Sequence, residues 1–422
     1  MNTDRNDRFE LTTGGMDFMY GDRFRSSAFF VVSLTMRVSP TILENALNET
    51  LGRFPQFDVR IAPEGDSLGF IPADSPLQVL EEASSIPACY EDVAWGGRVI
   101  CVSYLYKTIF FRYHRSVADE HGIIAFIKSV LFRYMELAGY PVANDGTVKH
   151  ISGTPFKAEN DDPMEKVEDY PASRPVWYMD AKAVRPTIDH SEGEDVAQVR
   201  IPLAKLSRSL EPLTNIPVTY LAPLFSHSVY ESMQEGINPG EYVVASIQIN
   251  LRPYFPTASL RPFHTPVFLA YNRILGDYPY NTVLMSQKKL LEAQLKTDAL
   301  AYSAQRKIAD IEKACRGSLE QKKSAFTALN DKMSAKSTYS VCRIGNLILP
   351  DQLQRYVTEF YPVIPASDQA YSMTVVSFKG EMFVTVAGRK DVAAVTDRFV
   401  ELLNGNGIHA FKADGFSFRY IK

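Results

Sequence analysis

Polar and titratable residues gather in one short segment, His114-Arg-Ser-Val-Ala-Asp-Glu-His121. An imidazole can act as a general base, and a carboxylate can pair with a cation or orient a neighbouring group. Ser116 beside His114 or His121 could also form a nucleophile and its base. That second signal is weak, because the segment lacks the Gly-x-Ser-x-Gly turn that exposes such a serine. The segment therefore favours proton-transfer chemistry over a serine nucleophile.

The elements predicted around this segment would hold it rigidly. β-branched and aromatic residues over 98–106 and 108–113 predict two strands that form a tight hairpin and lead into His114. After Gly122, apolar residues recur at helical spacing to Leu137, and we expect this helix to end at Gly139-Tyr-Pro141. The segment thus lies between a strand end and a helix start, where the helix N-terminus favours negative charge.

The rest of the chain alternates strands with helices and predicts an α/β fold of the α+β sandwich type. Strand patterns occur at 29–38, 57–61, 68–71, 197–201, 242–251, 373–378 and 382–387, and helical patterns at 40–52, 203–210, 217–233, 280–336 and 391–403. Residues 141–195 are rich in proline and carry an acidic run at 159–169, which is typical of a solvated linker. We therefore expect an N-terminal half at 1–150, a linker at 151–195 and a C-terminal half at 196–422.

Composition excludes several classes of protein. A chain of 422 residues, 45% hydrophobic and 22% charged, suits a globular protein of two domains. A net charge of −4 offers no overall field that would attract nucleic acid. Four widely spaced cysteines show no metal-ligand spacing and favour a reducing compartment, so we predict no metal site. The N-terminus has no secretory pattern and no apolar run reaches membrane-spanning length, which predicts a cytoplasmic protein without a membrane span.

Several segments resemble the condensation-domain and chloramphenicol-acetyltransferase-like superfamily, especially its alcohol-acetyltransferase-like branch. The signature of that superfamily, His-His-x-x-x-Asp-Gly at the end of a strand, corresponds here to His114-Arg-Ser-Val-Ala-Asp-Glu120. Further similar segments follow in the family's order, and they are Met16-Asp-Phe-Met-Tyr20, Arg53-Phe-Pro-Gln-Phe57, Ile249-Asn-Leu-Arg-Pro-Tyr-Phe-Pro256 with Ser259-Leu-Arg261, and Cys342-Arg-Ile-Gly345 with Leu347-Ile-Leu-Pro350. The resemblance covers most of the chain.

The resemblance implies a specific architecture and reaction. It implies two chloramphenicol-acetyltransferase-like halves that form a V with a tunnel between them. A thioester donor, on coenzyme A or on the pantetheine of an acyl carrier protein, would enter from one face, and an alcohol or amine acceptor from the other. The second histidine of the motif would be the general base. No covalently bound cofactor is implied.

The sequence departs from the motif at the positions that matter most. Arg115 replaces the second histidine, and a guanidinium cannot accept a proton near pH 7. Glu120 replaces the glycine, a bulky anion where the family has a tight turn. In the later segment, Cys342 and Arg343 stand where the family has serine and asparagine.

Other residues could take over some of these roles. His121 could turn inward at the helix start and serve as the base, and His114 is a second candidate, although on a strand it would face away from Arg115. Asp119 would pair with Arg252 by analogy with the family, or cap the following helix, and we weigh these two readings equally. Arg115 could share the Asp119 carboxylate. Other histidines, His264 among them, are interpreted as structural.

Two functions therefore stay open. The first is acyl transfer from a thioester to an alcohol or amine, with His121 or His114 as base or with positioning alone. The second is a non-catalytic relative that binds a ligand, a carrier protein or another partner. In that case Arg115 and Arg343 would suit a bound anion such as a carboxylate or phosphate, with Ser116 as a further tunnel candidate.

Overall fold

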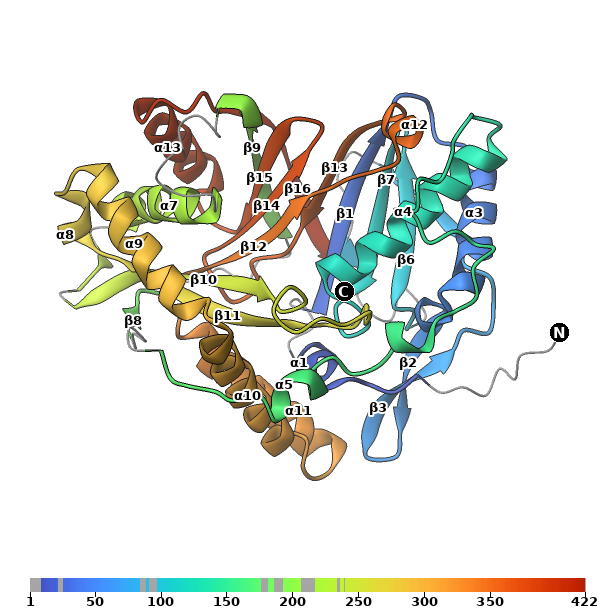
Figure 1. The fold of residues 1–422 in the computed structure, drawn as a ribbon, viewed down its shortest axis with the longest axis horizontal. Helices are drawn as coiled ribbons and strands as arrows, with labels where there is room; N and C mark the ends of the chain where they lie inside the picture. Colours follow the sequence, from blue (N-terminus) through green and yellow to red (C-terminus); the bar gives the residue numbers. More distant parts are fainter. Residues whose placement is uncertain are drawn as a thin grey trace.

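Two β-sheets, each covered by helices, form two lobes that lie side by side (Figure 1). The computed structural model describes residues 9–21, 26–83, 89–90, 97–175, 181–185, 193–205, 217–233, 236–238 and 240–421. The predicted fold class, a two-lobed α+β arrangement, is confirmed.

The first lobe is built on a five-stranded sheet. Its strands lie in the order β13 (Val357–Val363), β1 (Ser27–Leu34), β7 (Thr108–His114), β6 (Ile100–Leu105) and β4 (Val79–Glu81). β6 and β7 form the predicted hairpin through Tyr106, which has a positive φ of 56°. Two helices, α3 (Pro40–Arg53) and α4 (Glu120–Leu137), cover this sheet on the outer side in Figure 1. A separate hairpin pairs β2 (Val59–Glu64) with β3 (Ser67–Pro72).

The second lobe is built on a nine-stranded mixed sheet. Along its main path the strands are β11 (His264–Tyr271), β10 (Glu241–Asn250), β12 (Tyr339–Asn346), β14 (Tyr371–Phe378), β15 (Glu381–Gly388), β9 (Gly193–Pro202), β16 (Phe411–Ile421) and β5 (Cys89–Tyr90), and β8 (Lys182–Ala183) pairs with β10. Its longer helices are α7 (Pro217–Met233), α9 (Tyr280–Gln294), α10 (Thr297–Ala314), α11 (Leu319–Ser334) and α13 (Val392–Gly405). The shorter elements of the chain are α1 (Thr13–Met19), α5 (Glu165–Glu168), α8 (Arg273–Gly276), α12 (Asp351–Gln354), η1 (Pro55–Phe57) and η2 (Lys157–Glu159).

The two sheets exchange strands across the predicted halves. β13, which lies late in the chain, pairs antiparallel with β1 and becomes an edge strand of the first sheet. β5, which lies early in the chain, pairs with β16 in the second sheet. An edge position tolerates Pro362 inside β13, because a proline there leaves no ladder hydrogen bond unmade. The lobes are thus tied together by backbone pairing.

Most predicted elements are present, with shifted ends. The strand expected at 29–38 ends at Leu34, and the helical stretch at 280–336 is divided into α9, α10 and α11. Of the helix expected at 203–210, residues 203–205 are helical and the remainder lies outside the described residues. The strands without a counterpart among the predicted ones are β4, β5, β8, β11, β12, β13 and β16.

The expectation of a solvated acidic linker is wrong for one of its acids. Glu159 is buried, and its carboxylate lies 2.9 Å from the Arg53 guanidinium and 2.7 Å from Lys149 Nζ. Asp162 accepts a hydrogen bond of 2.5 Å from the backbone N–H of Thr13. This part of the segment is therefore docked onto the first lobe.

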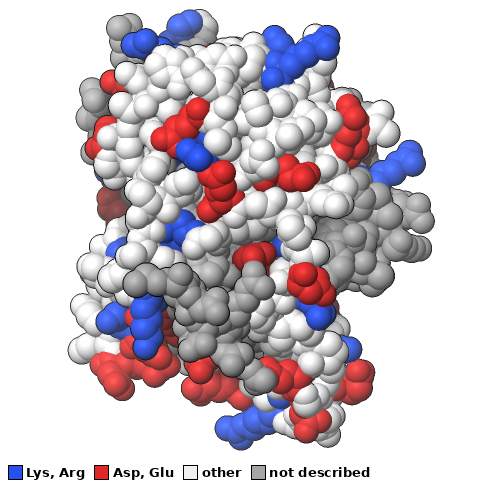
Figure 2. Space-filling view, turned by 90° about the vertical axis from the view of Figure 1, so that its right-hand side faces the viewer, with Lys and Arg blue, Asp and Glu red and all other residues white. Residues whose placement is uncertain are grey.

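Charges on the face toward α3 and α4 are mixed in sign. In Figure 2, Lys and Arg side chains are interspersed with Asp and Glu over this face. Among the described helices, none combines the length and the apolar character that a membrane crossing requires.

Candidate active site

The motif segment leaves the first sheet at the end of β7 and enters α4. β7 lies between β1 and β6, so the segment starts from the interior of a sheet. His114, the last residue of β7, is buried, and its Nδ1 lies 2.6 Å from the Ser116 hydroxyl. The two side chains therefore form a hydrogen bond with each other inside the first lobe.

Asp119 joins the two lobes. Its Oδ1 accepts a hydrogen bond of 2.8 Å from the Gly122 backbone N–H, which caps α4. Its Oδ2 accepts hydrogen bonds from Arg252 Nη1 at 2.7 Å and from the Phe263 backbone N–H at 2.9 Å. Burial works to raise the pKa of Asp119, but Arg252 and His121 outweigh it and lower that pKa to about 2. Asp119 therefore both pairs with Arg252 and caps α4.

Gly122 allows the close approach that this junction needs. A Cβ at residue 122 would lie 1.9 Å from the backbone oxygen of Leu260. The loop from the second lobe therefore packs directly on the start of α4. The tight position is at residue 122, and Glu120 does not obstruct it.

Arg115 and Glu120 form a buried ion pair. Arg115 Nε lies 2.9 Å from Glu120 Oε1, and their side chains are 10% and 4% exposed. The Tyr113 hydroxyl donates to the same carboxylate at 3.2 Å, and the Arg115 guanidinium lies 4.4 Å from the centre of the Phe18 ring. Burial works to lower the pKa of Arg115, but Glu120 more than offsets it and keeps the guanidinium charged. The side chain thus pairs with Glu120 instead of sharing Asp119.

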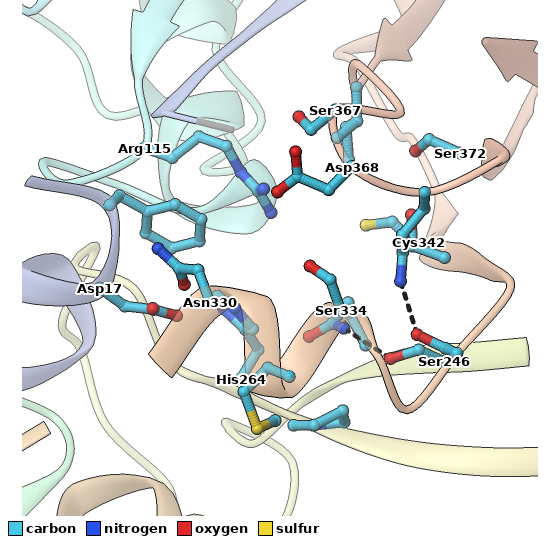
Figure 3. Close-up of a pocket in the computed structure, with 18 of the residues that line it drawn as sticks. Asp17, Arg115, Ser246, His264, Asn330, Ser334, Cys342, Ser367, Asp368 and Ser372 are labelled. Atoms are coloured by element: carbon cyan, nitrogen blue, oxygen red, sulfur yellow. Dashed lines mark hydrogen bonds between the residues drawn. The ribbon is translucent and has the colours of Figure 1, made fainter. Parts of the chain in front are cut away.

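A pocket of about 1030 Å³, including its part open to solvent, lies where the lobes meet (Figure 3). The first lobe supplies Arg115, and α1 supplies Asp17 and Phe18. The second lobe supplies the rest of the wall from β10, β11, α10, α11, β12, β14 and the loop at 364–369, including His264, Lys307, Asn330, Cys342, Ser367 and Asp368. Arg115, which the sequence resemblance aligns with the family's second histidine, therefore reaches the interlobe pocket.

One wall of the pocket is a row of hydroxyls. Ser246, Ser340 and Ser372 stand on β10, β12 and β14, and the strand register pairs each directly with the next. Directly paired residues point to the same face of a sheet. The row gives this wall a polar surface suited to hydrogen-bonding ligands.

His264 brings an imidazole to the pocket. It is the first residue of β11, opposite Asn250, and its Nδ1 is buried without a hydrogen-bond partner. Burial, reinforced by Lys307 and Arg115, holds the pKa of His264 well below its usual range, so the ring is neutral at pH 7. The residue before it, Phe263, is held by Asp119. The motif aspartate thereby fixes the strand start that presents His264.

Only some of the site residues predicted from sequence line this pocket. His114, Ser116, His121 and Arg343 are not among the described residues that line it. His121 is half-buried beside Asp119, and burial lowers its pKa. Arg343 is exposed, since alternate residues of β12 point to opposite faces and its neighbour Cys342 faces the pocket.

Sequence reasoning missed His264. We interpreted it as structural because no motif surrounds it, whereas its position at the start of β11, opposite Asn250 of β10, brings it to the pocket that Arg115 also lines. Cys342 also lines the pocket, and burial, with Glu120 nearby, raises the pKa of its thiol well above the usual range. In the described part of the chain, no group of three or more His, Cys, Asp or Glu is arranged to hold a metal ion.

Comparison with known proteins identifies the fold. No family model and no curated protein matches the sequence. Solved structures do match. The TRI101 protein of F. graminearum, solved with coenzyme A and deoxynivalenol, has a TM-score of 0.60 at 12% identity over 93% of this chain and 96% of its own. The chain therefore shares its fold with this protein.

Two further structures agree with this result. Polyketide synthase associated protein 5 from Mycobacterium tuberculosis has a TM-score of 0.62 at 10% identity, and covers 93% of this chain and 97% of its own. The epimerization domain from the third module of tyrocidine synthetase B has a TM-score of 0.60 at 12% identity, over 95% of this chain and 96% of its own. The predicted resemblance to the condensation-domain and chloramphenicol-acetyltransferase-like superfamily is thus confirmed at the level of the fold.

Proposed function

We propose that the protein transfers an acyl group from a thioester to an alcohol or amine in the interlobe pocket, with His264 as the general base. The observation that carries this proposal is the neutral His264 imidazole in the same pocket as Arg115. A neutral imidazole can accept the proton of an acceptor hydroxyl or amine. The deprotonated acceptor then attacks the thioester carbonyl, and the thiolate leaves and takes up a proton.

Arg115 acquires an electrostatic role in this scheme. It stays charged beside Glu120 and reaches the pocket. A fixed guanidinium can hold an anionic group of the substrate or stabilise the oxyanion that forms when the carbonyl is attacked. The lowered pKa of His264 makes the ring a weak base, so we expect slow turnover.

The neighbouring structures support a proposal for the donor. A neighbouring structure of this fold was solved with coenzyme A, and others come from nonribosomal peptide synthetases. We propose acyl-CoA or the pantetheine of an acyl carrier protein as donor, with no covalently bound cofactor and a cytoplasmic location.

A second function is favoured by the Arg115–Glu120 pair. The pair fills the place where the motif puts its base and its tight turn, and it holds both groups at 10% exposure or less. A protein that binds a ligand in this pocket without transferring an acyl group would need no imidazole there. His121 and His114 do not line the pocket, so neither is our proposed base.

Thiol release tests the proposal. Purified protein is incubated with acetyl-CoA and longer acyl-CoA and with a panel of alcohols and amines, and free thiol is followed over time. We expect His264→Gln to lower turnover roughly 10²-fold or more, the usual effect of losing a general base. The matched control is His409→Gln, which changes an exposed histidine outside the pocket.

A variant with the complete motif distinguishes acyl transfer from ligand binding without catalysis. Arg115→His with Glu120→Gly recreates the complete motif and removes both partners of the ion pair together. No thiol release by the wild type with any substrate, followed by release from the double variant, would establish the non-catalytic function. Wild-type turnover that His264→Gln leaves intact and His121→Gln abolishes would move the base to His121.

A further inference from the structure

We infer that the pocket binds a zwitterionic, amino-acid-like ligand, with its ammonium group on Asp368 and Ser367 and its carboxylate on Arg115. This inference rests on the proposed function only in treating the ligand as the acyl acceptor. It concerns the wall formed by residues 364–369, between β13 and β14, which no motif of the sequence analysis includes.

Asp368 differs from the other charged groups that line the pocket. Lys307 lies 3.4 Å from Asp17, Asp310 lies 3.9 Å from Lys332, and Arg115 is paired with Glu120. Within the described ranges, no cation lies within ion-pair distance of the Asp368 carboxylate. Arg185 donates to the backbone carbonyl of Asp368, at 3.3 Å. The carboxylate itself is half-buried and directed at the cavity (Figure 3).

Ser367 supplies a second unsatisfied group on the same wall. Its side chain is 3% exposed, and its hydroxyl has no hydrogen-bond partner in the described structure. Its backbone has a positive φ of 57°, a conformation that favours glycine. Strained backbone and an unsatisfied buried hydroxyl are both costly, and such costs are typically found where a ligand is bound.

A buried ion pair holds this loop in place. Glu194 accepts hydrogen bonds from the backbone N–H groups of Ala366 at 2.7 Å and of Ser367 at 3.2 Å. Arg389 lies 3.5 Å from Glu194 and donates to the backbone carbonyl of Ser367. Both side chains are almost fully buried. The Ser367 hydroxyl and the Asp368 carboxylate are therefore presented by a rigid backbone.

The opposite wall presents positive charge. In Figure 3, the side chains of Arg115 and Asp368, which both line the pocket, point toward each other. Glu120 Oε1 lies 2.9 Å from Nε of Arg115, and the guanidinium carries further N–H groups on its terminal nitrogens. A simple cation would be attracted by Asp368 but repelled by Arg115. A simple anion would be attracted by Arg115 but repelled by Asp368. A zwitterion satisfies both groups, and the serine row on β10, β12 and β14 offers polar contacts to the remainder.

Direct binding tests this inference without requiring catalysis. Free proteinogenic amino acids are screened against the wild-type protein by ligand-observed NMR, and hits are measured by calorimetry beside their N-acetyl and carboxamide derivatives. We expect binding by at least one amino acid, and roughly tenfold or greater weakening when either charge of the ligand is removed. Binding by none of the amino acids, or equal binding of an N-acetyl derivative, would overturn the inference.

Variants of the loop test the assignment of the two residues. Asp368→Asn should weaken binding roughly tenfold, and Ser367→Gly should weaken it several-fold without lowering the melting temperature, because glycine accepts the positive φ. The matched control, Asp351→Asn, neutralises an exposed acid outside the pocket and should leave the affinity unchanged. Unchanged affinity in Asp368→Asn would refute the inference.

The outcomes for the two proposals are distinguishable. Amino-acid binding without thiol release would support this inference and contradict acyl transfer. Thiol release with alcohols only, together with no binding of amino acids, would support acyl transfer and contradict this inference.

Discussion

The interlobe bridge at Asp119 makes a quantitative prediction about stability. Its pKa, lowered from 3.8 to about 2, corresponds to about 2.5 kcal/mol of stability at pH 7, at about 1.4 kcal/mol for each unit of pKa. Asp119→Asn keeps a side-chain oxygen but removes the charge, so we expect it to destabilise the protein by about 2.5 kcal/mol. Asp119→Ala also removes the cap of α4 and should cost about 1 kcal/mol more.

The pH dependence of this loss identifies its cause. A carboxylate whose pKa is depressed on folding contributes fully above its ordinary value near 3.8, and the contribution is lost as the pH falls toward 2. The difference between wild type and Asp119→Asn should therefore be constant from pH 7 to about 5 and should shrink below about pH 4.

Urea denaturation followed by fluorescence and far-UV circular dichroism measures this difference. The control is Asp397→Asn, which breaks the exposed pair with Lys412 and should cost about 0.5 kcal/mol or less. A loss below about 1 kcal/mol for Asp119→Asn at pH 7, or a loss that is as large at pH 3 as at pH 7, would refute the assignment of the stabilisation to the charged pair.

Three further predictions concern the same region of the fold. Gly122→Ala should destabilise by about 2 kcal/mol or more in urea denaturation, because the new Cβ would meet the Leu260 oxygen, whereas Gly52→Ala, with open space around it, should stabilise by about 0.5–1 kcal/mol. Ser367→Gly should raise stability by about 1 kcal/mol in the same assay by relieving the positive φ, and Ser367→Ala should not. The depressed pKa of His264 should make wild-type stability fall as the pH drops below about 6.5, and His264→Gln should flatten that dependence between pH 7 and 5.

Local sequence patterns predicted the frame of the site well. The hairpin of β6 and β7 and the long helix α4 follow from residue periodicity, which depends on neighbours in the chain. The Asp119–Arg252 pair followed from the resemblance to the superfamily, and the helix cap followed from the place of Asp119 before α4. Both interactions coexist because the two carboxylate oxygens point to different partners.

Features that depend on long-range pairing escaped prediction. The sequence of β13 contains a proline and does not by itself predict a strand. Only its pairing with β1 makes it a strand of the first lobe. Glu159 lies in a run of acids, and only Arg53 and Lys149 distinguish it from the solvated ones. His264 carries no local motif, and its place in the pocket follows from the register of β10 and β11. In each case the deciding partner lies far away in the sequence.

Arg115 and Glu120, where the sequence departs from the family's motif, depend on each other because they form one buried ion pair. A histidine at 115 beside Glu120 would leave a buried carboxylate without its guanidinium, and glycine at 120 beside Arg115 would leave a buried cation without its partner. Removing one partner of a buried ion pair typically costs about 3–5 kcal/mol. Arg115→His and Glu120→Gly should therefore each be destabilising alone, and the double variant should recover much of that loss. Activity measured in a single variant would mix lost stability with lost chemistry, so the restored motif is the informative form of the experiment.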